Sequence, residues 1–143
     1  VTAFDTSPVG VEKTKRLADK ALVQLEVFVA DINDFRLSET FDVIFSTGVL
    51  QYIPKEMRLE ALGNYRQFTS PNGINALSVF VKKPFIAGAP DAESVSHSWI
   101  SGELLNHYQD WRIEFTTEEI FDCMSSGLPH QHAISRVVAR KEI

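Results

Sequence analysis

The chain has 143 residues, the size of one domain, and 44% of them are hydrophobic, which suffices for a folded core and excludes a disordered protein. Its net charge of −5 argues against nucleic acid as the main partner, because phosphate binding requires a basic face. A single cysteine excludes an internal disulfide framework, so we expect a cytoplasmic protein, and no apolar run approaches the roughly 20 residues of a membrane span.

The first predicted elements are a strand and a helix. Residues 1–4 form a short apolar segment that is typical of a buried strand. Ser7 and Pro8 suit the N-cap and the first turn of a helix, which continues at helical spacing to Ala21. Asp5 lies between the two elements. It is either a capping carboxylate or a ligand group, because an acid at the end of a parallel strand can accept hydrogen bonds from ribose hydroxyls.

A second strand is predicted over residues 25–30, and Asp31 follows it as Asp5 follows the first. Because the carboxyl ends of parallel strands meet at one edge of a sheet, the two carboxylates suggest a shared binding edge. The alternative is that Asp31 only closes an Asx-turn.

The third predicted strand, residues 41–45, is apolar except for Asp42 and suits a strand buried on both faces of a parallel sheet. It ends at the small polar elbow Ser46-Thr47-Gly48, where a ligand can lie outside the carboxyl end of the strand. An amphipathic helix over residues 54–68 follows, with Arg58 expected to face water. This alternation of strands and helices is that of a doubly wound α/β sheet.

The second half of the chain predicts a long loop over residues 85–98, which we expect to act as a lid or a substrate wall. His97 and Trp99 are either groups that close over a substrate or ordinary loop packing. Tyr52 is either an acceptor contact or a core aromatic. The other predicted features are a turn at 70–73, strands at 74–81, 111–115 and 133–139, a mixed segment with a bulge and loop at 116–127, and a short helix capped by Ser101.

Two histidines precede the last predicted strand. His130 and His132 share one face if this segment is extended, and Arg136 follows on that face by parity. With Cys123 they are soft-metal ligands, substrate-pocket groups, or polar loop histidines beside a small buried cysteine. Because the spacing is irregular for a metal motif, the sequence assigns no metal.

Several segments, in this order and spacing, resemble the class I S-adenosylmethionine (SAM) methyltransferases. The end of the chain resembles more narrowly the TehB-like tellurite-resistance branch, and the resemblance covers essentially the whole chain. The segments are residues 2–8, 29–33, 41–50, 70–74 and 138–141 for the broad family, and 101–105 with 108–111 for the branch.

The resemblance implies an α/β fold with a Rossmann-like class I methyltransferase sheet, strand order 3-2-1-4-5-7-6 and the last strand antiparallel. It implies one domain over residues 1–143 and SAM as cofactor. Asp5 would hold the ribose hydroxyls and Asp31 the adenine amino group, with Ile32 on the adenine ring. Ser46 and Thr47 would lie beside the methionine portion of SAM.

The chain departs from the family at its start. The family's first strand carries a Gly-rich G-x-G-x-G loop, and this sequence has no such motif; residues 1–4 correspond to the family's second strand. We therefore expect family strands 2 to 7 in an N-terminally incomplete domain. Either the chain is a fragment of a longer protein, or it repairs its sheet by pairing directly or with another copy through the exposed edges.

Three functional hypotheses follow. The first is a SAM-dependent methyltransferase, an enzyme in its complete form, acting on a small molecule; the resemblance suggests a tellurite- or selenite-type oxyanion. Its catalytic residues are unknown, with His130, His132 and Arg136 as candidates. The second is a non-catalytic, oligomerising remnant of the fold that does not bind SAM. The third is a different nucleotide-binding α/β protein that uses Asp5 for a ribose.

Overall fold

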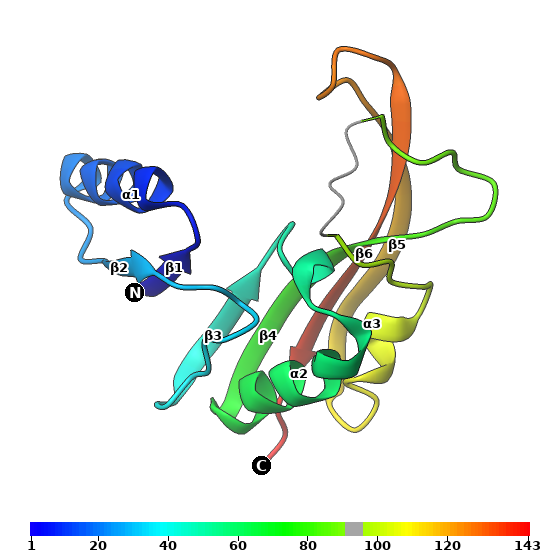
Figure 1. The fold of residues 1–143 in the computed structure, drawn as a ribbon. Coiled ribbons are helices and arrows are strands. Elements are labelled where there is room, and N and C mark those ends of the chain that lie inside the picture. The colour runs from blue at the N-terminus through cyan, green and yellow to red at the C-terminus, as the bar shows by residue number, and fades with distance from the viewer. Residues whose placement is uncertain (91–95) are drawn as a thin grey trace. The chain divides into compact units, whose positions relative to one another are not determined.

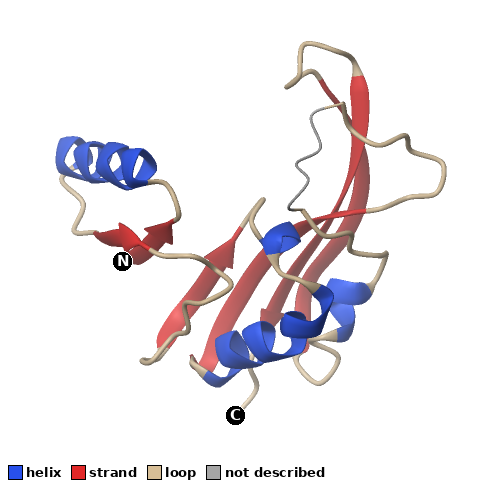
Figure 2. Ribbon diagram, in the orientation of Figure 1, coloured by secondary structure: helices blue, strands red, loops and turns tan. Residues whose placement is uncertain are grey.

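The computed structural model describes residues 1–90 and 96–143, which form two compact units, Val1–Arg36 and Leu37–Ile143. Each unit contains its own sheet, with one helix beside it in the first unit and several helical segments in the second (Figure 2). The single domain predicted over residues 1–143 stays a prediction. Among the described residues, no helix has the length and apolar character needed to cross a membrane.

The first unit is a β-α-β element. Strands β1 (Thr2–Asp5) and β2 (Glu26–Val29) pair in parallel and are connected by α1 (Pro8–Ala21) (Figure 1). Ser7 caps α1, because its hydroxyl accepts a hydrogen bond from the Gly10 amide at 3.1 Å. Parallel strands require such a crossover, so the strand-helix-strand pattern of the sequence is confirmed.

Aromatic and aliphatic side chains fill this unit. The ring centroid of Phe35 lies 4.8 Å from that of Phe4 and 5.3 Å from that of Phe28. Val11 from α1 and Val27 from β2 are buried. Phe4 and Phe28 come from neighbouring strands, so the turn after β2, which carries Phe35, is held against both.

The second unit is built on a four-stranded sheet of order β3-β4-β6-β5 (Figure 1). β3 (Phe41–Ser46) runs parallel to β4 (Thr69–Val81), whereas β6 (His130–Arg140) is antiparallel to β4 and to β5 (Arg112–Cys123). These strands reproduce the expected family order 4-5-7-6 with an antiparallel last strand, and the parallel pair β1-β2 reproduces 3-2. The Rossmann-like methyltransferase fold is confirmed.

Helical segments lie against this sheet. They are the 3-10 turns η1 (Leu50–Tyr52) and η2 (Lys55–Met57), and the helices α2 (Arg58–Gln67) and α3 (Glu103–Asn106). Ala61, Leu62 and Tyr65 of α2 are buried as predicted. The prediction that Arg58 faces water is wrong. It is 2% exposed, because its guanidinium is paired with Glu103 and bonded to backbone carbonyls.

The turn predicted at residues 70–73 lies inside β4 instead. The β3-β4 register shifts here, since Phe41 pairs with Thr69 but Val43 pairs with Ile74. The turn-forming residues therefore make an irregularity in the strand, with Asn72 at a φ of 64°. Gly73 is required by close packing, because a Cβ there would lie 2.7 Å from Thr69 Cγ2.

The mixed segment predicted at residues 116–127 is mostly strand, because β5 continues to Cys123. This segment lacks an apolar pattern because β5 is at one end of the strand order and most of its residues are exposed. The last strand likewise starts at His130 rather than at residue 133. The predicted Ser101 cap is also wrong: Gly102 is the N-cap of α3, and Ser101 Oγ accepts a hydrogen bond from Lys83 Nζ at 2.6 Å.

Candidate functional site

The two predicted nucleotide-binding carboxylates occupy equivalent places in the first unit. Asp5 is the last residue of β1, and Asp31 follows β2, so both lie at the carboxyl ends of paired parallel strands. Each Oδ1 accepts one hydrogen bond at 2.8 Å, from the amides of Ser7 and Asn33 respectively. Both carboxylates thus make the turn contact expected of an Asx-turn, which uses one oxygen of each.

The two residues after Asp31 each place a buried group beside this edge of the first unit. Ile32 is 4% exposed, so little of its side chain is available to a ligand ring. Asn33 Oδ1 is buried and has no hydrogen-bond partner among the described residues. A buried acceptor of this kind is costly unless a donor satisfies it, so a bound molecule or water supplying an N–H or O–H would be stabilised there.

The elbow after β3 is formed by Ser46, Thr47 and Gly48. Thr47 is fixed by its neighbour strand, since its Oγ1 accepts a hydrogen bond from Ser78 Oγ of β4 at 2.8 Å. Gly48 has a φ of 67°, and a Cβ there would meet no atom within 4 Å. The glycine is therefore needed for its backbone conformation, in open space at the carboxyl end of the strand.

Gln51 is hydrogen-bonded both to this elbow and to His97. Its Nε2 donates to the Gly48 carbonyl at 2.6 Å, and its backbone carbonyl accepts the His97 amide at 2.7 Å. Its buried Oε1 has no hydrogen-bond partner within the described ranges. Sequence reasoning did not select Gln51, and no pattern marks it, because its role depends on the fold of η1.

A cavity of about 490 Å³ lies in the second unit beside the carboxyl end of β4. Four of the residues singled out from the sequence contribute to its wall, namely Tyr52, His97, Cys123 and His132, and the described part of the predicted lid loop forms one side. The lining residues are Gln51, Tyr52, Phe80, Val81, Lys82, Ala89, Ser96, His97, Ser98, Phe121, Cys123, Ser125 and His132. Residues 91–95 of the predicted lid, with Asp91 and Glu93, lie outside the described residues.

The described residues of this wall carry positive but no negative formal charge. Among the described lining residues Lys82 is the one lysine or arginine, and there is no aspartate or glutamate, although the chain as a whole carries a net charge of −5. Histidine, hydroxyl and amide groups supply further hydrogen-bond donors. The wall therefore suits an uncharged or anionic molecule better than a cation.

The structure brings His130 and His132 together. Their Nε2 atoms lie 3.0 Å apart, and a ligand atom of Cys123 lies within 4.8 Å of both rings' ligand atoms. Arg136 is placed differently: it forms a cross-strand ion pair of 2.6 Å with Glu119 and is absent from the cavity wall. Trp99 is fully buried and donates its Nε1–H to the Leu50 carbonyl at 3.0 Å, which makes it a core residue.

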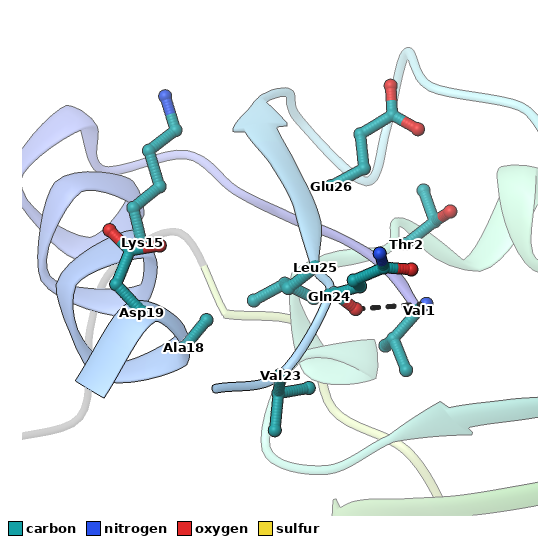
Figure 3. A pocket seen from close by; sticks show the side chains of 9 residues that line it. All are labelled: Val1, Thr2, Lys15, Ala18, Asp19, Val23, Gln24, Leu25 and Glu26. Atoms are coloured by element: carbon teal, nitrogen blue, oxygen red, sulfur yellow. Dashed lines mark hydrogen bonds between the residues drawn. The ribbon is translucent and has the colours of Figure 1, made fainter. Parts of the chain in front are cut away.

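A second hollow, of about 570 Å³, lies in the first unit (Figure 3). Its wall includes Val1 and Thr2 beside Leu25 and Glu26, at the amino ends of β1 and β2. Ligands of open α/β sheets bind at the opposite, carboxyl ends, where Asp5 lies. We assign this hollow no role in cofactor binding.

Comparison with known proteins identifies relatives along the whole chain. A family model described as tellurite resistance protein TehB matches residues 1–125. A probable SAM-dependent methyltransferase TehB from Haemophilus influenzae is 22% identical over 113 residues, covering 79% of this chain and 38% of that protein. A protein named hemagglutinin 1 from Eikenella corrodens is 28% identical over 145 residues, covering 99% of this chain and 47% of that protein.

The same likeness holds in three dimensions. The crystal structure of TehB from Haemophilus influenzae superposes with a TM-score of 0.86 at 21% identity, over 99% of this chain and 50% of that chain. The chain thus spans about half the length, or less, of the relatives that it matches.

Proposed function

The chain belongs to the TehB family, and from this premise we propose that it is part of a SAM-dependent methyltransferase that acts on a small molecule. The observation that carries the proposal is the placement of Asp5 and Asp31 at the carboxyl ends of the paired parallel strands β1 and β2. Carboxylates at this edge are suited to accept hydrogen bonds from the hydroxyl and amino groups of a nucleoside.

The proposed cofactor supplies a methyl group on a positively charged sulfur, which leaves as a neutral thioether when the acceptor attacks. The protein has to align acceptor and methyl group and to exclude water, and alignment alone can supply about 7–11 kcal/mol of the barrier. The reaction requires no dedicated acid or base.

Each proposed cofactor contact lies at or shortly after the carboxyl end of a strand. Asp5 and Asp31 each have one oxygen engaged in a turn and a second one, Oδ2, to accept hydrogen bonds from the ribose and the adenine amino group. Ser46 and Thr47 are proposed to lie beside the methionine portion, because Ser46 is the last residue of β3 and Thr47 follows it. Ile32 is proposed to contact the adenine ring through its small exposed surface.

We propose an oxyanion of the tellurite or selenite type as the acceptor. An oxyanion needs cationic or donor groups, and the cavity of the second unit offers Lys82, His97 and His132 with no carboxylate among its described lining residues. His132 and its neighbour His130 are the proposed acceptor-binding groups. Arg136, which is paired with Glu119, is a weaker candidate.

Titration calorimetry with S-adenosylhomocysteine tests the cofactor proposal. The Asp5→Asn variant keeps an oxygen to accept the Ser7 amide but removes the charge. Because hydrogen bonds to charged groups contribute about 1.5–3 kcal/mol, we expect binding to weaken by about 10- to 100-fold. The matched control is Asp19→Asn, on the exposed side of α1, which should bind like the parent chain. Equal binding by both variants would remove Asp5 from the site.

The oligomerising remnant is a second candidate. β3 pairs only with β4 among the described strands, and its side chains Val43 and Phe45 are 58% and 72% exposed. An apolar strand with an unpaired edge is a template for pairing with another chain. This candidate predicts self-association in size-exclusion chromatography together with no binding of S-adenosylhomocysteine.

The third hypothesis is a different nucleotide-binding α/β protein that uses Asp5 for a ribose. Binding of an adenine nucleotide, but not of S-adenosylhomocysteine, would favour it.

A further inference from the structure

The turn end of the β5-β6 hairpin brings together three side chains of the kinds that bind transition metals. Cys123 is the last residue of β5, and His130 and His132 lie at the start of β6. One ligand atom from each residue lies within 4.8 Å of the other two, and all three residues are half-buried.

The register of the hairpin explains this gathering. Cys123 and His130 are direct partners across the strands, so their side chains project from the same face. His132 lies two residues further along β6 and therefore returns to that face. The turn at residues 124–129 hides this proximity in the sequence, where the spacing from Cys123 to His130 matches no metal motif.

A backbone contact orients the ring of His130. Its Nδ1 lies 2.8 Å from the Leu128 carbonyl oxygen, which can only accept a hydrogen bond. Nδ1 therefore carries the hydrogen, and the lone pair of the neutral ring is on Nε2, which points at Nε2 of His132. Metal-binding histidines in proteins are commonly oriented by such a hydrogen bond from the second ring nitrogen.

The distances suit one shared cation. Two nitrogens each about 2.0–2.1 Å from a zinc ion in tetrahedral geometry lie about 3.3 Å apart, and the two Nε2 atoms are 3.0 Å apart. In the same geometry, with a Zn–S distance of about 2.3 Å, sulfur and nitrogen lie about 3.6 Å apart. Both separations fall within the 4.8 Å span of the cluster, so small side-chain rotations complete the site.

We propose that Cys123 Sγ, His130 Nε2 and His132 Nε2 bind one divalent cation of the zinc class. Cysteine binds such a cation as thiolate, so the Cys123 S–H proton is released to solvent as the sulfur–metal bond forms. In the metal-free pair His132 Nε2–H donates to His130 Nε2, so on metal binding this proton leaves to solvent while the neutral His132 ring takes one up at Nδ1, which frees the Nε2 lone pair for the metal. Three protein ligands leave a fourth position of the tetrahedron for water or a substrate atom. Cys123 and His132 also line the cavity of the second unit, so the proposed metal site borders a space that can hold an anion.

Cobalt(II) is the probe for this site, because it accepts the same ligands and absorbs light. Titration into the folded, reduced chain should give saturable d–d bands of a tetrahedral ion, a thiolate-to-cobalt charge-transfer band and a stoichiometry of one ion per chain. Zinc should then displace cobalt and abolish both signals. Absence of the charge-transfer band in the parent chain, with circular dichroism confirming its fold, would overturn the proposal.

Variants separate this site from ordinary histidine binding. Cys123→Ser should abolish the charge-transfer band, and His130→Gln or His132→Gln should weaken cobalt binding at least about tenfold, the loss seen even for outer-shell changes. His97→Gln, which alters the same cavity outside the cluster, is the matched control and should titrate like the parent chain. Unchanged cobalt binding in the His130 and His132 variants would contradict the proposal, and the close contact of the two rings would then be only a hydrogen bond.

This inference does not depend on methyl transfer. Cobalt binding is read without cofactor or substrate, and S-adenosylhomocysteine binding is read without metal. If the chain binds cobalt but not S-adenosylhomocysteine, the metal site is supported and the proposed function is contradicted. If it binds S-adenosylhomocysteine but not cobalt, the proposed function is supported and the metal site is contradicted.

Discussion

Arg58 and Glu103 form an ion pair in which Nη1 lies 2.6 Å from Oε1, and Arg58 is 2% exposed. The guanidinium also donates to the backbone carbonyls of Ile53 and Ser98 at 3.1 Å each, and it lies 4.1 Å from the ring centroid of Trp99. One side chain thus joins the start of α2, the segment before α3, and α3 itself. Ser98 belongs to the cavity wall, so this contact also positions that wall.

Replacing Arg58 by alanine should strongly destabilise the second unit. The change leaves the partly buried Glu103 carboxylate without its cation and two carbonyls without their donor. Removing one partner of a buried ion pair typically costs about 3–5 kcal/mol, and we expect the lower end because Glu103 is 18% exposed. Urea unfolding monitored by circular dichroism measures the change in the free energy of unfolding.

The control for this prediction is Arg112→Ala. Arg112 pairs with Glu114 on the surface, where ion pairs contribute little, so we expect no measurable change in stability. If both variants unfolded at the same urea concentration, the buried Arg58 contacts would contribute no more to stability than a surface ion pair.

Two glycines should respond in opposite ways to alanine. At Gly73 an added Cβ would lie 2.8 Å from the Ser70 carbonyl and 2.9 Å from the Asp42 carbonyl, so backbone has to move. We expect Gly73→Ala to cost about 1–3 kcal/mol, the range for overpacked sites. Gly63 lies in α2 with no atom within 4 Å of its added Cβ, so Gly63→Ala should stabilise by about 0.5–1 kcal/mol.

The melting temperatures of these two glycine variants, measured side by side, check this prediction. A loss at position 63 would mean that the glycine is needed for something other than helix geometry. A neutral result at position 73 would mean that the bulged start of β4 relaxes easily.

The sequence predicted the parts of the fold that depend on strong apolar periodicity. The strand, helix and strand of the first unit, the elbow after β3 and α2 all follow from short-range pattern and capping. β5 was missed beyond residue 115 because an exposed edge strand carries polar residues such as Glu119, whose partner Arg136 is far along the chain. The burial of Arg58 was missed for the same reason, since Glu103 is distant in sequence.

The candidate site was predictable only in part. Parity placed His130 and His132 on one face, and the structure brings their rings together. The position of Cys123 opposite His130 depends on the hairpin register, which irregular turn residues do not specify. Gln51 and Lys82 enter the cavity wall through loop conformation, for which the sequence carries no periodic signal.

Lowering the pH should destabilise the protein through His107. Burial lowers the pKa of His107, with Arg66 and Arg58 acting in the same direction and Glu103 against it. The unfolded chain therefore binds a proton at a higher pH than the folded chain does. Stability from this residue is present above about pH 6.5, the ordinary histidine value, and is lost as the pH falls below it.

The urea midpoint measured at neutral and mildly acidic pH checks this effect. The parent chain should lose more stability on acidification than His107→Gln, which has no ring to protonate. The exposed residue His97 provides the control, and His97→Gln should follow the parent chain. A steeper acid loss in His107→Gln than in the parent would contradict the predicted sign.

Tyr108 belongs to a buried hydrogen-bond network with Asn75 and Thr69 of β4. Its hydroxyl oxygen accepts from Asn75 Nδ2 at 2.9 Å, and Asn75 Oδ1 accepts from Thr69 Oγ1 at 2.9 Å. Tyr108 and Asn75 are fully buried. Tyr108→Phe therefore leaves the Asn75 amide without its acceptor, and we expect a loss of about 1–3 kcal/mol in the free energy of unfolding.

The same residue predicts a loss of stability in alkali. Burial raises the pKa of Tyr108 well above its ordinary value, so the unfolded chain releases the phenol proton first. Stability from this residue is intact below about pH 10, the ordinary tyrosine value, and is lost as the pH rises above it. Tyr108→Phe, which cannot ionise, should lose less stability between neutral and alkaline pH than the parent chain. Tyr52→Phe serves as the comparison, because Tyr52 lines the cavity and is only half-buried. If both variants matched the parent in alkali, the buried phenol would not control the alkaline transition, and ionisation of exposed groups would have to explain it.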